Sequence, residues 1–280
     1  MMRSICCRRM SGFTYVDVLV GLAILLLLVP AVMVFMPSLN GRTRCGGGNR
    51  MKCASNLKQI GLAMLLYSTE NRGHYPRTTY VSGPDVKPTW GTGTMSSDPF
   101  AGPDPHDVTA AMFLLLRTQD ITSEVFTCPS SNAERDTYGG GTNAAINRAN
   151  FTDWRKNLSY SMHNPYASDG VIKESERSTW WTNSMSAEFA VAADINPGVV
   201  GAGDNVLAPT STSSSKDMKL ANSNNHDGDG QNVLFGDGHV EFVQNPFVGV
   251  QRDNVYANKR GQVVASPVDA TDTVLVPTDD

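Results

Sequence analysis

A long apolar stretch near the start of the chain constrains the fold more than any other feature. Residues Val18 to Met36 contain no charged side chain. At a rise of about 1.5 Å per residue, a helix of about 20 apolar residues crosses the hydrocarbon core of a bilayer. The sequence therefore predicts that this stretch is a transmembrane helix.

The residues before the apolar stretch distinguish it from an ordinary signal peptide. They form a leader that carries Arg3, Arg8 and Arg9, has no acidic residue and ends at Gly12. In a secretory signal peptide, the small residue of the cleavage site follows the apolar region. Here the small residue precedes it, so that cleavage after Gly12 would leave the helix on the mature protein. A plain signal peptide and a plain membrane anchor are the alternatives.

The segment from Ser11 to Asp17 resembles the N-terminus of type IV prepilins and pseudopilins. In that family a prepilin peptidase cuts after the glycine and methylates the new N-terminal residue. The resemblance implies cleavage after Gly12 and methylation of Phe13. Because arginines flank the apolar stretch on both sides, charge bias does not orient it. The resemblance implies a single-pass inner-membrane protein with a cytoplasmic N-terminus and a periplasmic or extracellular C-terminal domain.

Asp17 is an acidic residue at the start of this apolar helix. A carboxylate in a membrane helix is costly and needs a partner. The family usually has glutamate here, and its partner is understood to be the N-terminal amine of the neighbouring subunit. The resemblance therefore implies that Asp17 acts in assembly with other pilin or pseudopilin subunits. Alternatively, Asp17 lies at the headgroup boundary, near the positive end of the helix dipole.

The remainder of the chain has the size of one exported domain. About 240 residues follow the apolar segment, enough for one hydrophobic core with elaborations. The net charge is −4, and no basic patch suggests a nucleic-acid partner. We divide the chain into a cleaved leader (1–12), a transmembrane or assembly helix (13–40), a Gly-rich hinge (41–49), a pilin-like domain (50–257) and a polar tail (258–280).

Two further helices are predicted after the hinge. Gly46 to Gly48 favour the hinge because glycine is a poor helix former. Apolar residues then recur every three or four positions, which predicts a helix over Arg50 to Glu70 that packs on a sheet. Its stripe consists of Cys53, Leu57, Ile60, Met64 and Tyr67. Asp107 is a candidate N-cap for a short helix that ends at Arg117.

Several short strands complete the expected α+β fold. Leu158 to Met162 and Phe189 to Asp194 are candidate strands. In the run Asn232 to Phe242, two apolar segments flank Asp237-Gly238, which predicts a β-hairpin. With the resemblance, these elements imply a pilin-like architecture: a long N-terminal membrane helix, then a helix packed on an antiparallel β-sheet with long loops. The tail from Asn258 is a candidate for disorder.

Three segments resemble a group of bacterial prepilin-like proteins that is abundant in planctomycetes. They are Cys53 to Ala63, Val125 to Ser130, and a C-terminal region that resembles the group's His-x9-Asp-Gly signature. The signature residues here are His226, Asp237 and Gly238, with one residue more than the usual spacing.

The cysteines outside the leader are odd in number, so one of them lacks an intramolecular partner. Cys53 and Cys128 lie within the resembling segments, whereas Cys45 lies in the Gly-rich insertion. In an oxidising exterior we therefore expect a Cys53–Cys128 disulfide. Two free, separately buried cysteines are the alternative.

No residue pattern predicts catalysis, since the sequence has no Gly-x-Ser-x-Gly, His-Glu-x-x-His or Walker-type motif. We expect no enzyme activity, no catalytic residue and no cofactor. Asp227, Asp229 and Asp237 are weak candidates for a calcium site, but the expected last acidic ligand is displaced, which favours turn residues. The tryptophans are candidates for a glycan-binding platform, although packing is the preferred interpretation; they are Trp90, Trp154, Trp180 and Trp181.

The sequence thus predicts a structural subunit of a type IV pilus or of a type II secretion pseudopilus. Its expected partners are the prepilin peptidase, other pilin or pseudopilin subunits and the inner membrane. The alternative is a membrane-anchored exported module that binds glycan or calcium.

Overall fold

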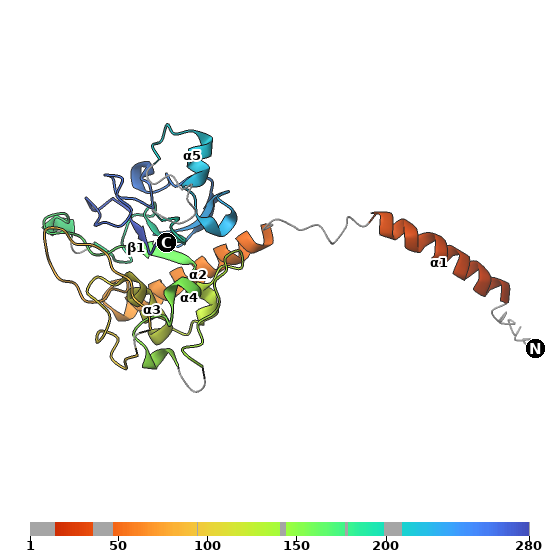
Figure 1. Cartoon of the computed structure of the whole chain (residues 1–280), viewed down its shortest axis with the longest axis horizontal. Coiled ribbons are helices and arrows are strands. Elements are labelled where there is room, and N and C mark those ends of the chain that lie inside the picture. The colour runs from red at the N-terminus through yellow and green to blue at the C-terminus, as the bar shows by residue number, and fades with distance from the viewer. Residues whose placement is uncertain are drawn as a thin grey trace, which may run out of the picture. The chain divides into compact units, whose positions relative to one another are not determined.

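The computed structural model describes residues 15–35, 47–93, 95–140, 144–176, 179–198 and 209–279. They belong to two compact units, Met1–Arg44 and Cys45–Asp280, which we describe one at a time (Figure 1).

The first unit contains helix α1, Tyr15–Phe35, with Asp17 in its first turn. Within the part of the chain that the structure describes, no helix is both long enough and apolar enough to cross a membrane. The expected span, Val18 to Met36, reaches beyond the described residues and stays a prediction. Gly12 and Phe13, the expected processing site, also lie outside the described residues.

Helix α2, Gly47–Glu70, opens the second unit. Its predicted apolar stripe faces the core, where Leu57 and Ile60 are fully buried. The helix begins three residues earlier than expected, because Gly47 and Gly48 are helical and not part of a hinge. Adding a residue to an existing helix gains a hydrogen bond, whereas glycine costs only about 1 kcal/mol relative to alanine. The expected hinge residues before Gly47 lie outside the described part.

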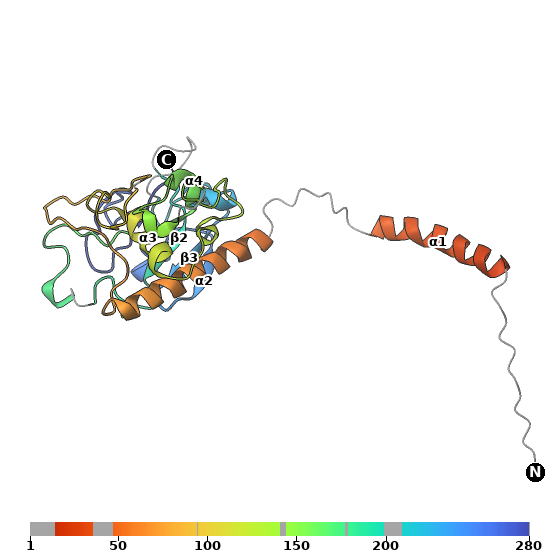
Figure 2. The same ribbon diagram turned by 90° about the horizontal axis from the view of Figure 1, so that it is seen from below.

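A five-stranded sheet of order β4-β3-β2-β1-β5 forms the centre of the domain. All neighbouring strands are antiparallel. Helix α2 contacts β2, β3, β4 and helix α3, and it runs along one side of the domain (Figure 2). The helix-on-sheet α+β arrangement is therefore confirmed. The bounds are β1 Tyr160–His163, β2 Ala190–Asp194, β3 Gln231–Phe235, β4 Val240–Val243, β5 Leu275–Val276, α3 Val108–Thr118, α4 Trp154–Asn157 and α5 Ser215–Leu220.

Two local predictions are confirmed in detail. The carboxylate of Asp107 caps α3 by accepting a hydrogen bond of 2.8 Å from the Ala110 N–H, and burial raises the pKa of Asp107 to about 6. Strands β3 and β4 form the expected hairpin. Gly238 supplies the positive φ of its turn, at 82°.

The C-terminal segment corrects an expectation. Residues from Asn258 onward are part of the folded domain instead of a disordered tail, since Val274, Leu275 and Val276 are fully buried. Strand β5 pairs with β1 at one edge of the sheet. These β-branched and apolar residues fit a pleated, buried surface. Their burial offsets the entropy lost on ordering the chain.

Gly230, just before β3, provides a test of the hairpin's packing. Its φ is +151°, and a Cβ atom there would lie 2.2 Å from the Val243 carbonyl oxygen. Gly230→Ala should therefore destabilise the domain much more than Gly170→Ala. Gly170 has a φ of +76°, but no atom of the described residues lies within 4 Å of its Cβ position, so alanine there costs only about 1–2 kcal/mol of backbone strain. Urea unfolding of both variants measures the difference, and equal losses would contradict the packing.

Candidate functional site

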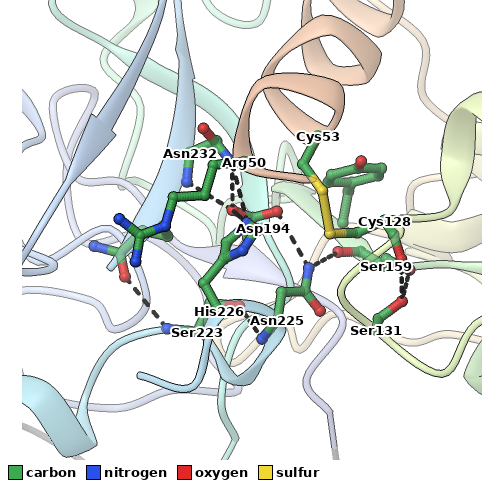
Figure 3. Close-up of polar contacts among 12 residues, drawn as sticks. Arg50, Cys53, Cys128, Ser131, Ser159, Asp194, Ser223, Asn225, His226 and Asn232 are labelled. Carbon is green, nitrogen blue, oxygen red and sulfur yellow. Dashed lines mark hydrogen bonds and ion pairs between the residues drawn. A yellow bond between two sulfur atoms is a disulfide. The ribbon is translucent and has the colours of Figure 1, made fainter. Parts of the chain in front are cut away.

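A disulfide joins helix α2 to the middle of the chain. Cys53 of α2 bonds Cys128, which follows the 3-10 turn Ser123–Phe126, and their Cα atoms are 5.2 Å apart (Figure 3). Both residues are buried, with exposed fractions of 0% and 1%. The predicted Cys53–Cys128 pair is therefore confirmed, and the alternative of two separate thiols is wrong.

A buried carboxylate–imidazole pair lies beside the disulfide (Figure 3). Asp194 ends β2, and His226 ends the 3-10 turn Asn224–His226. Asp194 Oδ2 lies 3.1 Å from His226 Nε2, and both side chains are fully buried. The other ring nitrogen, His226 Nδ1, has no hydrogen-bond partner among the described residues. We call Cys53, Cys128, Asp194 and His226 the four-residue cluster.

Two asparagines hold the Asp194 carboxylate in place. The backbone N–H and the side-chain amide of Asn232 donate to Oδ2 over 2.6 and 3.0 Å. The Asn225 amide donates to Oδ1 over 3.2 Å and also to the Ser159 carbonyl over 2.8 Å. A buried carboxylate requires such donors, because desolvation otherwise disfavours its charged form.

Two buried tyrosines border this network. The Tyr160 hydroxyl accepts a hydrogen bond of 3.2 Å from the Asn56 amide. The Tyr256 hydroxyl donates to the Asp194 carbonyl oxygen over 2.9 Å. Burial, and secondly the charge of Asp194, raise the pKa of both phenols well above 10. Both hydroxyls therefore keep their protons near neutral pH.

An aromatic ring packs against His226, and an arginine lies over that ring. The His226 ring packs edge-on against Phe242, with 5.7 Å between centroids. The Arg50 guanidinium lies over the same Phe242 ring, 4.3 Å from its centroid. Asp229 holds Arg50 through a contact of 3.0 Å and also contacts Lys219 at 2.7 Å. The hydrogen bond from Lys219, with the smaller effect of Arg50, lowers the pKa of Asp229.

The three carboxylates that were candidates for a calcium site do not meet. Asp229 is already paired with two cations. Asp227 follows the turn at His226 with a φ of 57°. Asp237 contacts the ring of its hairpin neighbour His239 at 2.5 Å. Among the described residues, the set of metal-ligating side chains compact enough for one ion is the four-residue cluster, which contains none of the three.

The residues of the C-terminal signature lie in two separate parts of the domain. His226 belongs to the buried cluster, whereas Asp237 and Gly238 form the hairpin turn. The hydrogen bond from the His239 N–H lowers the pKa of Asp237. The Gly238 carbonyl accepts a hydrogen bond of 2.6 Å from Lys58 of α2, which ties the hairpin to the helix.

The four tryptophans pack within the domain and form no shared platform. Trp154 and Trp181 are buried, and Trp90 packs edge-on against Trp154 with 6.1 Å between centroids. Trp180 is partly exposed and lines a cavity of about 570 Å³ together with Tyr80 and Arg77.

The sequence did not reveal Asp194 or its asparagine partners. Asp194 ends an apolar run, and such an acid ordinarily marks the end of a strand at the surface. The uninterrupted apolar residues from Phe189 to Ala193 could have indicated that Asp194 is buried, since a strand that is apolar on both faces is buried throughout. A polar residue at the end of such a strand is therefore a candidate for a buried network.

The comparisons with known proteins identify a family for part of the chain. Residues 49–198 match the model of a family described as "Protein of unknown function (DUF1559)". The matched range includes Cys53, Cys128 and Asp194, whereas His226 follows it. No curated protein and no solved structure matches the chain.

Proposed function

The chain belongs to the DUF1559 family, and from its own residues we propose that it is a prepilin-like structural subunit of a type IV pilus or of a type II secretion pseudopilus. In this proposal a prepilin peptidase cuts after Gly12 and methylates Phe13. The chain is then the substrate of that enzyme and is not itself a catalyst.

The order of the parts along the chain carries the proposal. A small residue precedes an apolar helix with Asp17 in its first turn, and a second long helix, α2, then packs on an antiparallel sheet. The type IV pilins that the chain resembles likewise have an apolar assembly helix followed by a domain outside the membrane. They usually run one continuous helix where this chain has the Gly-rich segment before α2.

The disulfide supports placing the domain outside the cytoplasm. Disulfides persist in oxidising compartments and are rare where thioredoxin and glutathione keep thiols reduced. The Cys53–Cys128 bond therefore suits a periplasmic or extracellular domain on a single-pass inner-membrane protein.

Assembly would proceed by helix packing. The apolar helices of successive subunits would pack together, with the Asp17 carboxylate paired to the N-terminal amine of a neighbour. An ion pair of this kind offsets the cost of a charge in lipid. Repeated head-to-tail contacts of this type produce a helical filament.

Replacing Gly12 tests processing and assembly together. Gly12→Leu should leave the leader on the chain, because the peptidase requires a small residue before the cut, and the uncut chain should be absent from filaments. Mass spectrometry of the N-terminus, in cells with an active prepilin peptidase, measures the first effect. Immunodetection of the chain in sheared filaments measures the second.

The matched control is Ser4→Leu, which changes the leader away from the cut and should be processed and assembled normally. Mature protein of unchanged mass from the Gly12→Leu chain would contradict the proposal.

One observation favours a second function, an anchored module that binds glycan. Trp180, Tyr80 and Tyr166 line the cavity of about 570 Å³, together with the Arg77 guanidinium. Aromatic rings beside a polar group suit a sugar ring and its substituents. Correct processing of the chain without any incorporation into filaments would favour this function over the first.

A further inference from the structure

We propose that the four-residue cluster is a zinc site when its disulfide is reduced, with Cys53, Cys128, Asp194 and His226 as the ligands. This inference goes beyond filament assembly, because it concerns a ligand of the folded domain and not its neighbours.

The positions of the ligand atoms suit a single ion. One ligand atom from each of the four residues lies within 4.8 Å of the others. Zinc takes four ligands from sulfur, nitrogen and oxygen at about 2.0–2.3 Å. The corners of such a tetrahedron are about 3.3–3.8 Å apart. Small movements of the side chains therefore suffice once the two sulfur atoms separate.

The ligands reach this point from four separate parts of the chain. They lie on α2, after the 3-10 turn Ser123–Phe126, at the end of β2 and in the turn Asn224–His226. All three segments that resemble the prepilin-like group contribute, through Cys53, Cys128 and His226. A single structural disulfide needs only two of these segments. The fold therefore brings a carboxylate and an imidazole to the same point as the two cysteines.

The surroundings of the cluster are those of a metal site. Asn225 and Asn232 fix the Asp194 carboxylate by hydrogen bonds of 2.6–3.2 Å. Such outer partners orient ligands and raise metal affinity. One nitrogen of the fully buried His226 ring has no hydrogen-bond partner in the described part of the chain, and a buried polar atom without a partner is costly. Phe242 packs edge-on against the imidazole, and Arg50 lies over the Phe242 ring.

Reduction is required because a disulfide sulfur offers no thiolate. A dithiol supplies two electrons and two protons: the Cys53–Cys128 bond breaks, both sulfurs become thiols, and the dithiol becomes a disulfide. Zinc then replaces the two thiol protons, which leave to solvent. In the zinc form, one ring nitrogen of His226 binds the ion and the other carries a proton.

The exchange leaves the buried charge unchanged. The two positive charges of the zinc ion balance the two negative charges of the new thiolates. Zinc and the two thiolates together therefore add no net charge to the protein core. This matters because burying extra charge carries a large desolvation cost. The oxidation state of the two sulfurs would decide whether the domain holds metal.

Cobalt titration of the full chain tests the proposal. Cys6, Cys7 and Cys45 are first replaced by serine, so that Cys53 and Cys128 are the cysteines that remain. The chain is reduced with a phosphine, which is then removed without oxygen. We expect one Co²⁺ per chain, with tetrahedral d–d bands and thiolate charge-transfer bands that Zn²⁺ abolishes. The disulfide form should show neither set of bands.

His226→Gln isolates the histidine ligand, because glutamine retains an N–H for Asp194. It should weaken Co²⁺ binding by at least about 100-fold, whereas His239→Gln, at the exposed hairpin turn, should not. Circular dichroism of the disulfide form verifies that each variant is folded. Absence of Co²⁺ binding to the reduced chain would overturn the proposal, as would binding that is insensitive to His226→Gln.

The fold of the reduced chain is followed in the same titration. If reduction unfolds the domain, Zn²⁺ should refold it, and His226→Gln should prevent that refolding. A reduced chain that stays unfolded with Zn²⁺ would equally overturn the proposal. None of these readouts involves processing or filaments, so failure here leaves the proposed structural role intact.

Discussion

Asp194→Ala should lower the free energy of unfolding by about 3–5 kcal/mol, because several buried donors lose an acceptor at about 1–3 kcal/mol each. The side chain is fully buried and contacts His226 Nε2 at 3.1 Å. Its loss removes the acceptor of two N–H groups of Asn232, whereas the Asn225 amide loses one acceptor and keeps the Ser159 carbonyl. Each unsatisfied buried donor carries its own desolvation penalty.

Urea unfolding of the full chain, in its disulfide form and with a chelator present, measures this loss. Asp229→Ala is the matched control, because it also removes an aspartate that contacts two partners, Arg50 and Lys219. Asp229 is half exposed, with a side-chain exposed fraction of 49%, so its loss should cost below about 1 kcal/mol. Similar losses for the two variants would show that the Asp194 network does not stabilise the fold.

Removal of the disulfide should have an effect of similar size. The bond joins residues 75 positions apart, and closing a loop of that length stabilises by about 4 kcal/mol in the chain-entropy model. We expect Cys53→Ala with Cys128→Ala to lose about that amount. The physical reason lies in the unfolded chain, which gains conformational freedom when the cross-link is absent.

The same unfolding assay, again with a chelator, measures the double variant. Cys45→Ala is the control, because Cys45 lies outside the disulfide, and its stability should equal that of the original chain. The result would be contradicted if the double variant were as stable as the Cys45→Ala chain, or if free-thiol labelling of the unfolded, unreduced protein modified both Cys53 and Cys128.

Local sequence order accounts for the elements that were predicted correctly. The stripe on α2 is a repeat of three and four residues, so neighbours in the sequence are enough to define its buried face. Asp107 caps α3 through a residue three positions away. The hairpin turn depends on Gly238 and the apolar residues on either side. Each of these interactions acts over a few residues, and a sequence displays such interactions directly.

The predicted boundary between folded domain and tail is wrong, because contacts between distant parts of the chain decide it. Strand β5 has only two residues, Leu275 and Val276, too few to display an alternating pattern. It is a strand because β1, more than 100 positions earlier in the chain, provides a partner. The tail from Asn258 therefore appeared polar and unstructured, although its apolar residues complete the sheet.

The sequence by itself determined the helix α2 and the hairpin. It predicted the pairing of Cys53 with Cys128 through a resemblance, and the structure decided between that pairing and two separate thiols. Only the tertiary structure placed Asp194 and His226 beside that disulfide. Their proximity depends on the antiparallel register of β2 and β3, which sets Ala193 opposite Val233, and on the packing of α2 over the same strands. Contacts between residues so far apart in the chain leave no periodic pattern in the sequence, because they arise only when the elements close on one core.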